Sequence, residues 1–166
     1  MAEIHKFSLL YVAAEDRLAL DTEDVEGATT RLWLTQRLCR GLVAALVPIL
    51  QTAVPPALSG QPHETAQAWE QAAAMADFGK TPGVQSRTDS IAGLVEAVHI
   101  RPAAGQTVFT FDFGAGDARV VSLTLPALRQ TLAVMHRLHV EAGWPLDLWP
   151  AWIADPSAQA GGGAVN

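Results

Sequence analysis

The stretch RLWLTQRLCRGLVAAL, residues 31–46, changes from the spacing of a strand to that of a helix. Over 31–34, leucines alternate with charged and aromatic residues, which is the period-2 pattern of a half-buried strand. From Gln36 onwards, apolar residues recur every three or four positions, as in a helix with one buried face. Thr35 lies at the transition, where a threonine side chain can cap a helix. The stretch therefore predicts a strand at 29–35 followed directly by a helix.

Four residues at helical spacing define the buried face that we expect for this helix: Cys39, Val43, Leu46 and Leu50. Pro48 lacks a backbone N–H, so we expect it to kink the helix or to end its regular part. Two further strands are predicted at 6–12 and 18–22, each followed by a turn with acidic residues, and the second turn also contains Gly27. The order is strand, strand, strand, helix.

The same order returns in the second half of the chain. Strands are predicted at 94–101, 107–113 and 118–124, and the three phenylalanines of the middle strand share one face. Thr124 can cap the helix that follows, with Pro126 in its first turn. The buried stripe of this helix is expected to consist of Leu128, Leu132, Met135 and His139.

A shift of 89 residues aligns 31–46 with 120–135, with four identities and coincident helix stripes. Arg40 and Arg129 are one of the identical pairs. We therefore predict an α+β fold of two β-β-β-α units, at about 4–54 and 91–143, as an internal duplication. Their antiparallel sheets are expected to be covered by helices.

Between the halves, PPALSGQP at 55–62 has the composition of a linker. An alanine-rich helix is predicted at 63–78, with Trp69 as its anchor, and a loop follows at 79–90. Residues 1–148 are expected to form a single domain. Residues 149–166 are expected to form a tryptophan-containing C-terminal segment and a flexible tail.

Composition limits the classes of function. The 166-residue chain is 49% hydrophobic and carries a formal charge of −6, which argues against binding a phosphate backbone as its main task. Its one cysteine, Cys39, is expected to be a buried, inert thiol in a reducing compartment. The longest apolar run, at 41–50, is too short for a membrane crossing. We expect a cytoplasmic protein without a bound cofactor.

The segment WPLDLWPAWIADP, residues 144–156, contains three of the five tryptophans. Its prolines predict an extended or turning backbone over 144–153. Such an apolar segment either packs on its own domain or is buried by another chain, and tryptophan is a favoured interface anchor. The candidate partner-binding residues are Trp149, Trp152 and Ile153, with Trp33 and Arg31 as a second choice.

Candidate chemical groups are sparse. His136 and His139 stand three positions apart on the second helix and are weak candidates for a metal site, because no third ligand follows at helical spacing. His99 and Asp112 can approach one another across neighbouring strands. The acidic run at 15–26 departs from a calcium-binding loop at Val25 and predicts solvated hairpin turns.

Several segments resemble those of a family of small, uncharacterised bacterial proteins. They are AAEDRLALDTEDVEG (13–27), RLWLTQRL (31–38), ADFG (76–79) and WPLDL (144–148). The resemblance extends over about residues 6–148 and implies a bacterial source. It supplies no activity, cofactor or catalytic residue.

These observations favour a non-enzymatic accessory or adaptor protein that acts through protein–protein interaction or self-association. Two alternatives stay open. One is a small-molecule or metal-dependent enzyme that uses His99, Asp112, His136 and His139. The other is a protein that binds single-stranded nucleic acid on a sheet face, by stacking on Tyr11 and Trp33 beside Arg31, Arg37 and Arg101.

Overall fold

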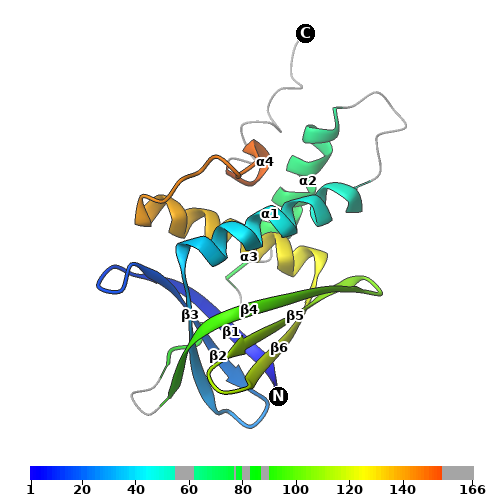
Figure 1. Cartoon of the computed structure of the whole chain (residues 1–166). Coiled ribbons are helices and arrows are strands. Elements are labelled where there is room, and N and C mark those ends of the chain that lie inside the picture. The colour runs from blue at the N-terminus through cyan, green and yellow to red at the C-terminus, as the bar shows by residue number, and fades with distance from the viewer. Residues whose placement is uncertain (55–61, 77, 80–82, 87–89, 155–166) are drawn as a thin grey trace. The chain divides into compact units, whose positions relative to one another are not determined.

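The computed structural model describes residues 1–54, 62–76, 78–79, 83–86 and 90–154 (Figure 1). Its contacts divide the chain into two compact units, which are described separately. One unit comprises Met1–Cys39 and Thr81–Thr124, and the other comprises Arg40–Lys80 and Leu125–Asn166. The first contains every described strand and the second contains most of the helical residues. The predicted α+β class is confirmed.

Six strands close into a barrel in the order β1-β2-β3-β4-β5-β6. They are β1 (Ala2–Val12), β2 (Arg17–Asp24), β3 (Thr29–Leu34), β4 (Ile91–Ala103), β5 (Gln106–Phe113) and β6 (Asp117–Thr124). Each set of three consecutive strands is an antiparallel meander, and the parallel pairs β3–β4 and β1–β6 join the two meanders.

The expectation of separate antiparallel sheets is corrected by this closure. Each meander alone would leave two edges with unpaired backbone N–H and C=O groups, and closing the barrel pairs them. The duplication itself stays a prediction. The half-units at about 4–54 and 91–143 cut across the observed division, which separates strands from helices rather than the first half from the second.

The barrel interior is built by alternating residues, as the period-2 pattern predicted. Phe109, Phe111 and Phe113 of β5 are all buried, and so are the alternate leucines of β2 and β3. Gly93 of β4 faces the Phe113 ring. A Cβ atom at Gly93 would lie only 2.4 Å from Cδ2 of Phe113, closer than real Cβ contacts allow. The glycine therefore makes room for an aromatic ring in the barrel.

Substitution of Gly93→Ala should lower the free energy of unfolding by about 1–3 kcal/mol, because overpacking forces the Phe113 ring or the strand to move. Gly41→Ala is the matched control, since Gly41 lies within a helix with open space around it. The control should leave stability unchanged or raise it by up to about 1 kcal/mol. Urea unfolding measures both variants, and equal stability of the two would contradict the packing argument.

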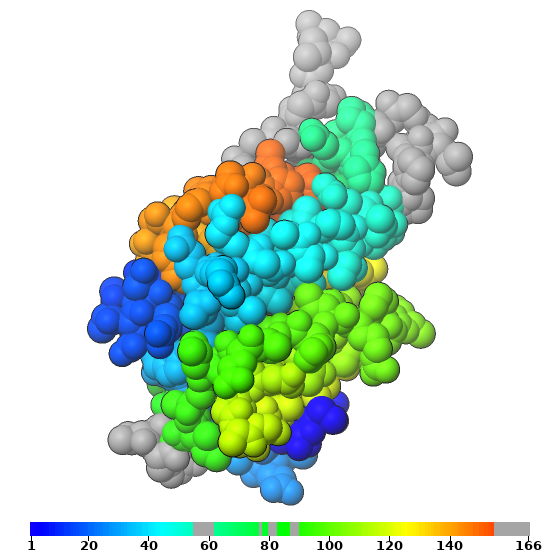
Figure 2. Space-filling model, in the orientation of Figure 1, coloured from blue at the N-terminus to red at the C-terminus, as the bar shows by residue number. Residues whose placement is uncertain are grey.

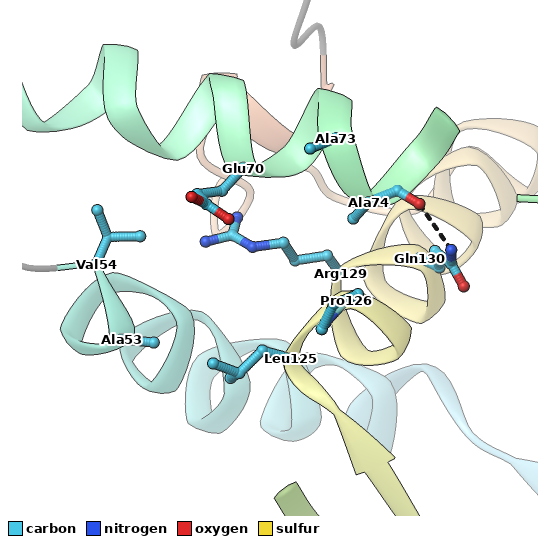
Figure 3. Close-up of a pocket in the computed structure, with 9 residues that line it drawn as sticks. All are labelled: Ala53, Val54, Glu70, Ala73, Ala74, Leu125, Pro126, Arg129 and Gln130. Atoms are coloured by element: carbon cyan, nitrogen blue, oxygen red, sulfur yellow. Dashed lines mark hydrogen bonds between the residues drawn. The ribbon is translucent and has the colours of Figure 1, made fainter. Parts of the chain in front are cut away.

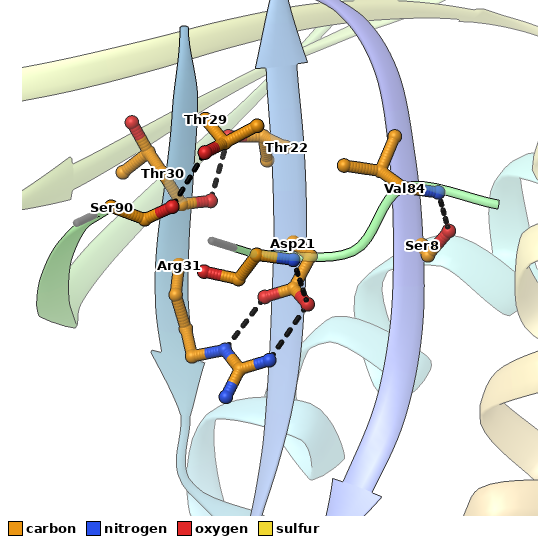
Figure 4. Close-up of polar contacts among 9 residues, drawn as sticks. Ser8, Asp21, Thr22, Thr29, Thr30, Arg31, Val84 and Ser90 are labelled. Carbon is orange, nitrogen blue, oxygen red and sulfur yellow. Dashed lines mark hydrogen bonds and ion pairs between the residues drawn. The ribbon is translucent and has the colours of Figure 1, made fainter. Parts of the chain in front are cut away.

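A cluster of polar contacts fixes residues 83–86 to the outside of the barrel (Figure 4). The Val84 N–H donates to Ser8 Oγ at 2.7 Å, and the Ser86 N–H donates to Asp21 Oδ2 at 3.0 Å. Arg31 donates through Nε and Nη2 to the two oxygens of Asp21, at 2.7 and 2.8 Å. Asp21 is only 1% exposed, so this member of the acidic run is not the solvated turn residue that the sequence predicted.

Substitution of Asp21→Ala should cost about 2 kcal/mol of stability, because it leaves Arg31 and the Ser86 N–H without their acceptor. Hydrogen exchange at the Val84 and Ser86 amides should accelerate more than exchange in β5. The control is Asp112→Ala, which removes an exposed hydrogen-bond partner of His99 and should change stability by no more than about 0.5 kcal/mol. Unchanged exchange at both amides in Asp21→Ala would sink this account.

The helices are α1 (Gln36–Ala53), α2 (His63–Ala76), α3 (Leu125–Ala142) and α4 (Ala151–Ala154). Both predicted stripes are confirmed, since every member is buried. Thr35 caps α1, with its Oγ1 accepting from the Leu38 N–H at 3.2 Å. The helix continues past Pro48 to Ala53, so Pro48 does not end it, and the alternative that Pro48 kinks the helix stays a prediction. Thr52 Oγ1 donates to the Pro48 carbonyl at 3.0 Å.

The role predicted for Trp69 in α2 is also wrong, because Trp69 is 50% exposed. Glutamines hold this helix instead. Gln67 Nε2 donates to the carbonyls of Leu50 and Gln51 at 3.0 and 3.3 Å, and both belong to the last turn of α1, where carbonyls lack a partner within the helix. Gln130 Nε2 similarly donates to the Ala74 carbonyl in the last turn of α2, at 2.7 Å.

Several predicted segments fall wholly or partly outside the described residues. They are the linker at 55–62, the loop at 79–90 and the C-terminal tail beyond residue 154. Within the described parts of the chain, no helix combines the length and the apolar character that a membrane crossing needs.

Candidate functional site

A pocket of about 360 Å³ opens between the end of α1, the middle of α2 and the start of α3 (Figure 3). Its walls are small or apolar side chains: Ala53, Val54, Ala73, Ala74, Leu125 and Pro126. Two charged residues line it as well. Glu70 of α2 and Arg129 of α3 point toward one another in Figure 3. The pocket lies within the helical unit, and its volume is in the range of about 300–1,000 Å³ that is common for ligand sites.

Arg129 is the distinctive group of this pocket, because it is a charged residue that is only 3% exposed. Its Nη2 donates to Gln67 Oε1 at 2.7 Å, and its Nη1 donates to the Gln67 carbonyl at 3.5 Å. Its guanidinium carbon lies 5.4 Å from the ring centre of Trp152, in a cation–π contact. Burial lowers the pKa of Arg129, while the charge of Glu70 acts in the opposite direction.

The charge of Arg129 is therefore removed from water without being neutralised at close range. Among the described residues it forms no ion pair. A guanidinium has five N–H donors, and the contacts with Gln67 use two of them. A carboxylate that replaces Glu70 as the nearest counter-charge can accept from the remaining donors in the bidentate geometry that arginine favours.

The candidate partner-binding residues at the C-terminal end pack against the helical unit. Trp152 and Ile153 of α4 are buried, and Trp149 is partly buried. The Trp149 ring stands edge-on to His136 and His139, with centres 5.1 Å apart in each case. In Figure 2 this segment, drawn in orange, lies against helices of the same unit. Docking of Trp149, Trp152 and Ile153 on another chain stays a prediction, and it requires these side chains to leave their present contacts.

The expected backbone of this segment is partly corrected. Residues 144–150 contain no helix or strand, as the prolines predicted, but residues 151–154 form the short helix α4. An ion pair holds the segment to α1, with Arg40 Nη1 and Nη2 at 2.6 and 3.0 Å from the Asp147 oxygens. This exposed pair positions the segment and contributes little to stability.

The second-choice candidates, Trp33 and Arg31, lie together on the outer face of β3. The Arg31 guanidinium carbon is 5.4 Å from the Trp33 ring centre. The same guanidinium is bound by Asp21, so its positive charge is offset by a neighbouring carboxylate. This pairing weakens the case for nucleic-acid binding at this face, which needs a net positive field.

The three candidate histidines, His99, His136 and His139, occupy three different environments. His99 and Asp112 do meet across β4 and β5, with Nε2 and Oδ2 2.8 Å apart, and both side chains are exposed. His136 is partly buried, whereas His139 is fully buried and its Nδ1 donates to the Met135 carbonyl at 2.7 Å. In the described part of the chain, no three His, Cys, Asp or Glu side chains are grouped to hold a metal ion.

Burial also determines how His139 titrates. Its Nε2 has no hydrogen-bond partner among the described residues, so a second proton there would be buried without an acceptor. Burial lowers the pKa of His139 and that of His136. Since the folded-state pKa values lie below the unfolded value of about 6.5, stability is present above that pH and is lost as the pH falls below it.

We expect the urea midpoint of the protein to fall between pH 7 and pH 5 for this reason. In His139→Phe, which keeps an aromatic ring beside Trp144 and Trp149, that fall should be smaller. The control is His5→Gln, at an exposed strand position, which should retain the original pH dependence. If His139→Phe and the unaltered chain lose stability equally between pH 7 and pH 5, His139 is not the source of the pH dependence.

Cys39 behaves as the sequence predicted for a buried thiol. It is fully buried, and burial raises the pKa of its thiol to about 12. Because the thiolate is the reactive form, the native protein should react with iodoacetamide at pH 8 at least about a thousandfold more slowly than the urea-unfolded chain. Mass spectrometry over time measures the rates. Rapid labelling of the native protein would contradict the burial.

Sequence reasoning missed the pocket. Arg129 was visible only as one member of an aligned pair with Arg40, and that alignment carries no information about burial. Gln67 and Gln71 gave no signal, because glutamine on a helix is ordinarily a solvent-facing residue.

Comparisons with protein-family models, with curated proteins and with solved structures find no match for this chain.

Proposed function

We propose that this chain is a non-enzymatic accessory protein that binds a protein partner through the Arg129 pocket. The partner contributes a carboxylate, either from an acidic side chain or from its C-terminus. One observation carries this proposal: a nearly fully buried guanidinium, with no ion pair among the described residues, lines an open and largely apolar pocket. A bound carboxylate compensates the desolvation that Arg129 suffers in the free protein.

The surface beside the pocket supports a protein partner. Trp69 is half exposed and precedes Ala73, a pocket residue, by one helical turn, so both lie on the same side of α2. Tryptophan and arginine are the residues most enriched among the side chains that dominate binding energy in protein interfaces. Trp69 thus provides apolar contact area next to a site of charge recognition.

The proposal is tested with two pools of random octapeptides. One pool has free C-termini and contains Asp and Glu, and the other is amidated and lacks both residues. The immobilised chain should enrich the first pool, and Arg129→Met should reduce that enrichment about tenfold or more. Arg137→Met, on an exposed position of the same helix, is the matched control and should retain it.

Trp69→Ala and Ala73→Leu keep the test informative if Arg129→Met fails to fold. Both positions are exposed, and the leucine should fill the pocket without touching the charge of Arg129. Both should weaken retention of the acidic peptides while circular dichroism stays unchanged. Equal retention of the acidic and amidated pools by the unaltered chain would overturn the proposal.

Four expectations from the sequence accompany this proposal. They are an origin by internal duplication, a bacterial source, a cytoplasmic location and a contribution of the C-terminal tryptophan segment to association. Trp152 links the last of these to the pocket, since its ring lies against the Arg129 guanidinium. A carboxylate that binds Arg129 would therefore change the contact between Arg129 and Trp152 that holds this segment in place.

A further inference from the structure

A second pocket of about 370 Å³ lies elsewhere in the helical unit, between α2, α3 and the end of α4. Ala133, His136 and Val140 follow one stripe of α3, and Met75 lies one turn beyond Gln71 on α2. Ile153 contributes from α4. None of these side chains belongs to the Arg129 pocket, so the two sites can be altered separately.

Gln71 lines this pocket, and one of its two polar side-chain atoms lacks a hydrogen bond among the described residues. The residue is fully buried, and its Nε2 donates to the Arg129 carbonyl at 3.1 Å. Because a carbonyl only accepts, this contact fixes which end of the amide is nitrogen. The opposite atom, Oε1, is buried and has no hydrogen-bond partner among the described residues. A buried acceptor without a donor is unfavourable, and a ligand that opens the lining enough for its N–H to reach Oε1 relieves it.

The remaining lining favours an aromatic ligand. The Met75 thioether makes favourable contacts with aromatic rings, and an arginine such as Arg137 stacks on them. Burial lowers the pKa of His136, so its imidazole is neutral at pH 7 and adds a flat, uncharged surface. The apolar residues Ala133, Val140 and Ile153 offer contact area to the ring.

We propose that this second pocket binds a neutral, planar aromatic group with one N–H donor, of the indole type, which donates to Gln71 Oε1. This inference does not rest on the proposed function, because it concerns different side chains and a different ligand chemistry. The same indole chemistry can come from a free small molecule or from a tryptophan side chain of a partner.

Indole and 1-methylindole are the paired probes, since they have the same ring system and 1-methylindole carries a methyl group in place of the N–H hydrogen. Titration of the full chain, followed by 1H–15N NMR, should shift the Gln71 side-chain amide and the backbone amides of Ala133 and Val140. Indole should bind about tenfold more tightly than 1-methylindole. N-acetyltryptophanamide distinguishes the sources: if it binds, the site takes a side chain, and if indole alone binds, the site takes a free ligand.

Two variants test the assignment. Gln71→Met should remove the preference for indole over 1-methylindole, and Ala133→Leu should abolish binding of both by filling the space. Ala73→Leu, which fills the Arg129 pocket instead, is the control and should leave indole binding unchanged. Equal affinity for the two probes, or no binding of indole at millimolar concentration, would overturn the proposal, whatever the peptide experiment on the Arg129 pocket shows.

Discussion

The helical unit depends on glutamine side chains that satisfy backbone carbonyls at helix ends. The last turn of any α-helix presents carbonyl oxygens without a partner in the helix, and burying them unsatisfied is costly. Gln67 satisfies two of them at the end of α1, and Gln130 satisfies one at the end of α2. Gln71 adds a fourth amide contact, to the carbonyl of Arg129. An alanine-rich helix that buries little apolar area is held in this way.

Both pockets follow from alanines in their walls, which belong to α2 in the Arg129 pocket and to α3 in the second pocket. Alanines at 73 and 74 give one wall of the Arg129 pocket little bulk, and the short side chain of Ala133 on α3 does the same for the second pocket. A helix anchored by leucines would fill these spaces in order to bury its own apolar area. Anchoring by hydrogen bonds leaves the space beside the helix open, so it combines stable attachment with hollows that a ligand can enter.

Two buried charged residues of the described chain, Asp21 and Arg129, differ in how their charges are balanced. Asp21 receives two hydrogen bonds from Arg31 and one from a backbone N–H, which makes it an anchor with its charge balanced at close range. Arg129 has a carbonyl, an amide oxygen and an aromatic ring as partners, all of them uncharged. The positive charge of Arg129 interacts with the negative charge of Glu70 only through space, without an ion-pair contact between these two described residues.

The elements of the fold could be predicted from local patterns, whereas their assembly could not. Thr35 and the stripe from Cys39 to Leu50 combine a cap with a helical period, and Phe109 to Phe113 show the period of a strand, so each gives its own signal. Barrel closure depends on pairing between β3 and β4, which lie far apart in the sequence, and no local pattern records it. The anchoring of α2 has no local signature, because a glutamine on a helix ordinarily faces solvent whereas Trp69, the largest apolar side chain of this helix, has the pattern of an anchor. The Arg129 pocket was missed for a related reason, since a single arginine does not show whether it is buried.

Closure through parallel pairs also has a consequence for how the barrel is made. The first meander presents two open strand edges, and their partners, β4 and β6, are translated only after α1 and α2. During synthesis the nascent chain therefore carries unpaired backbone at both sides of β1–β3, a state that invites pairing with other chains. Charged side chains on the two edge strands, including Lys6 of β1 and Arg31 of β3, oppose such pairing while the ribosome completes the second half.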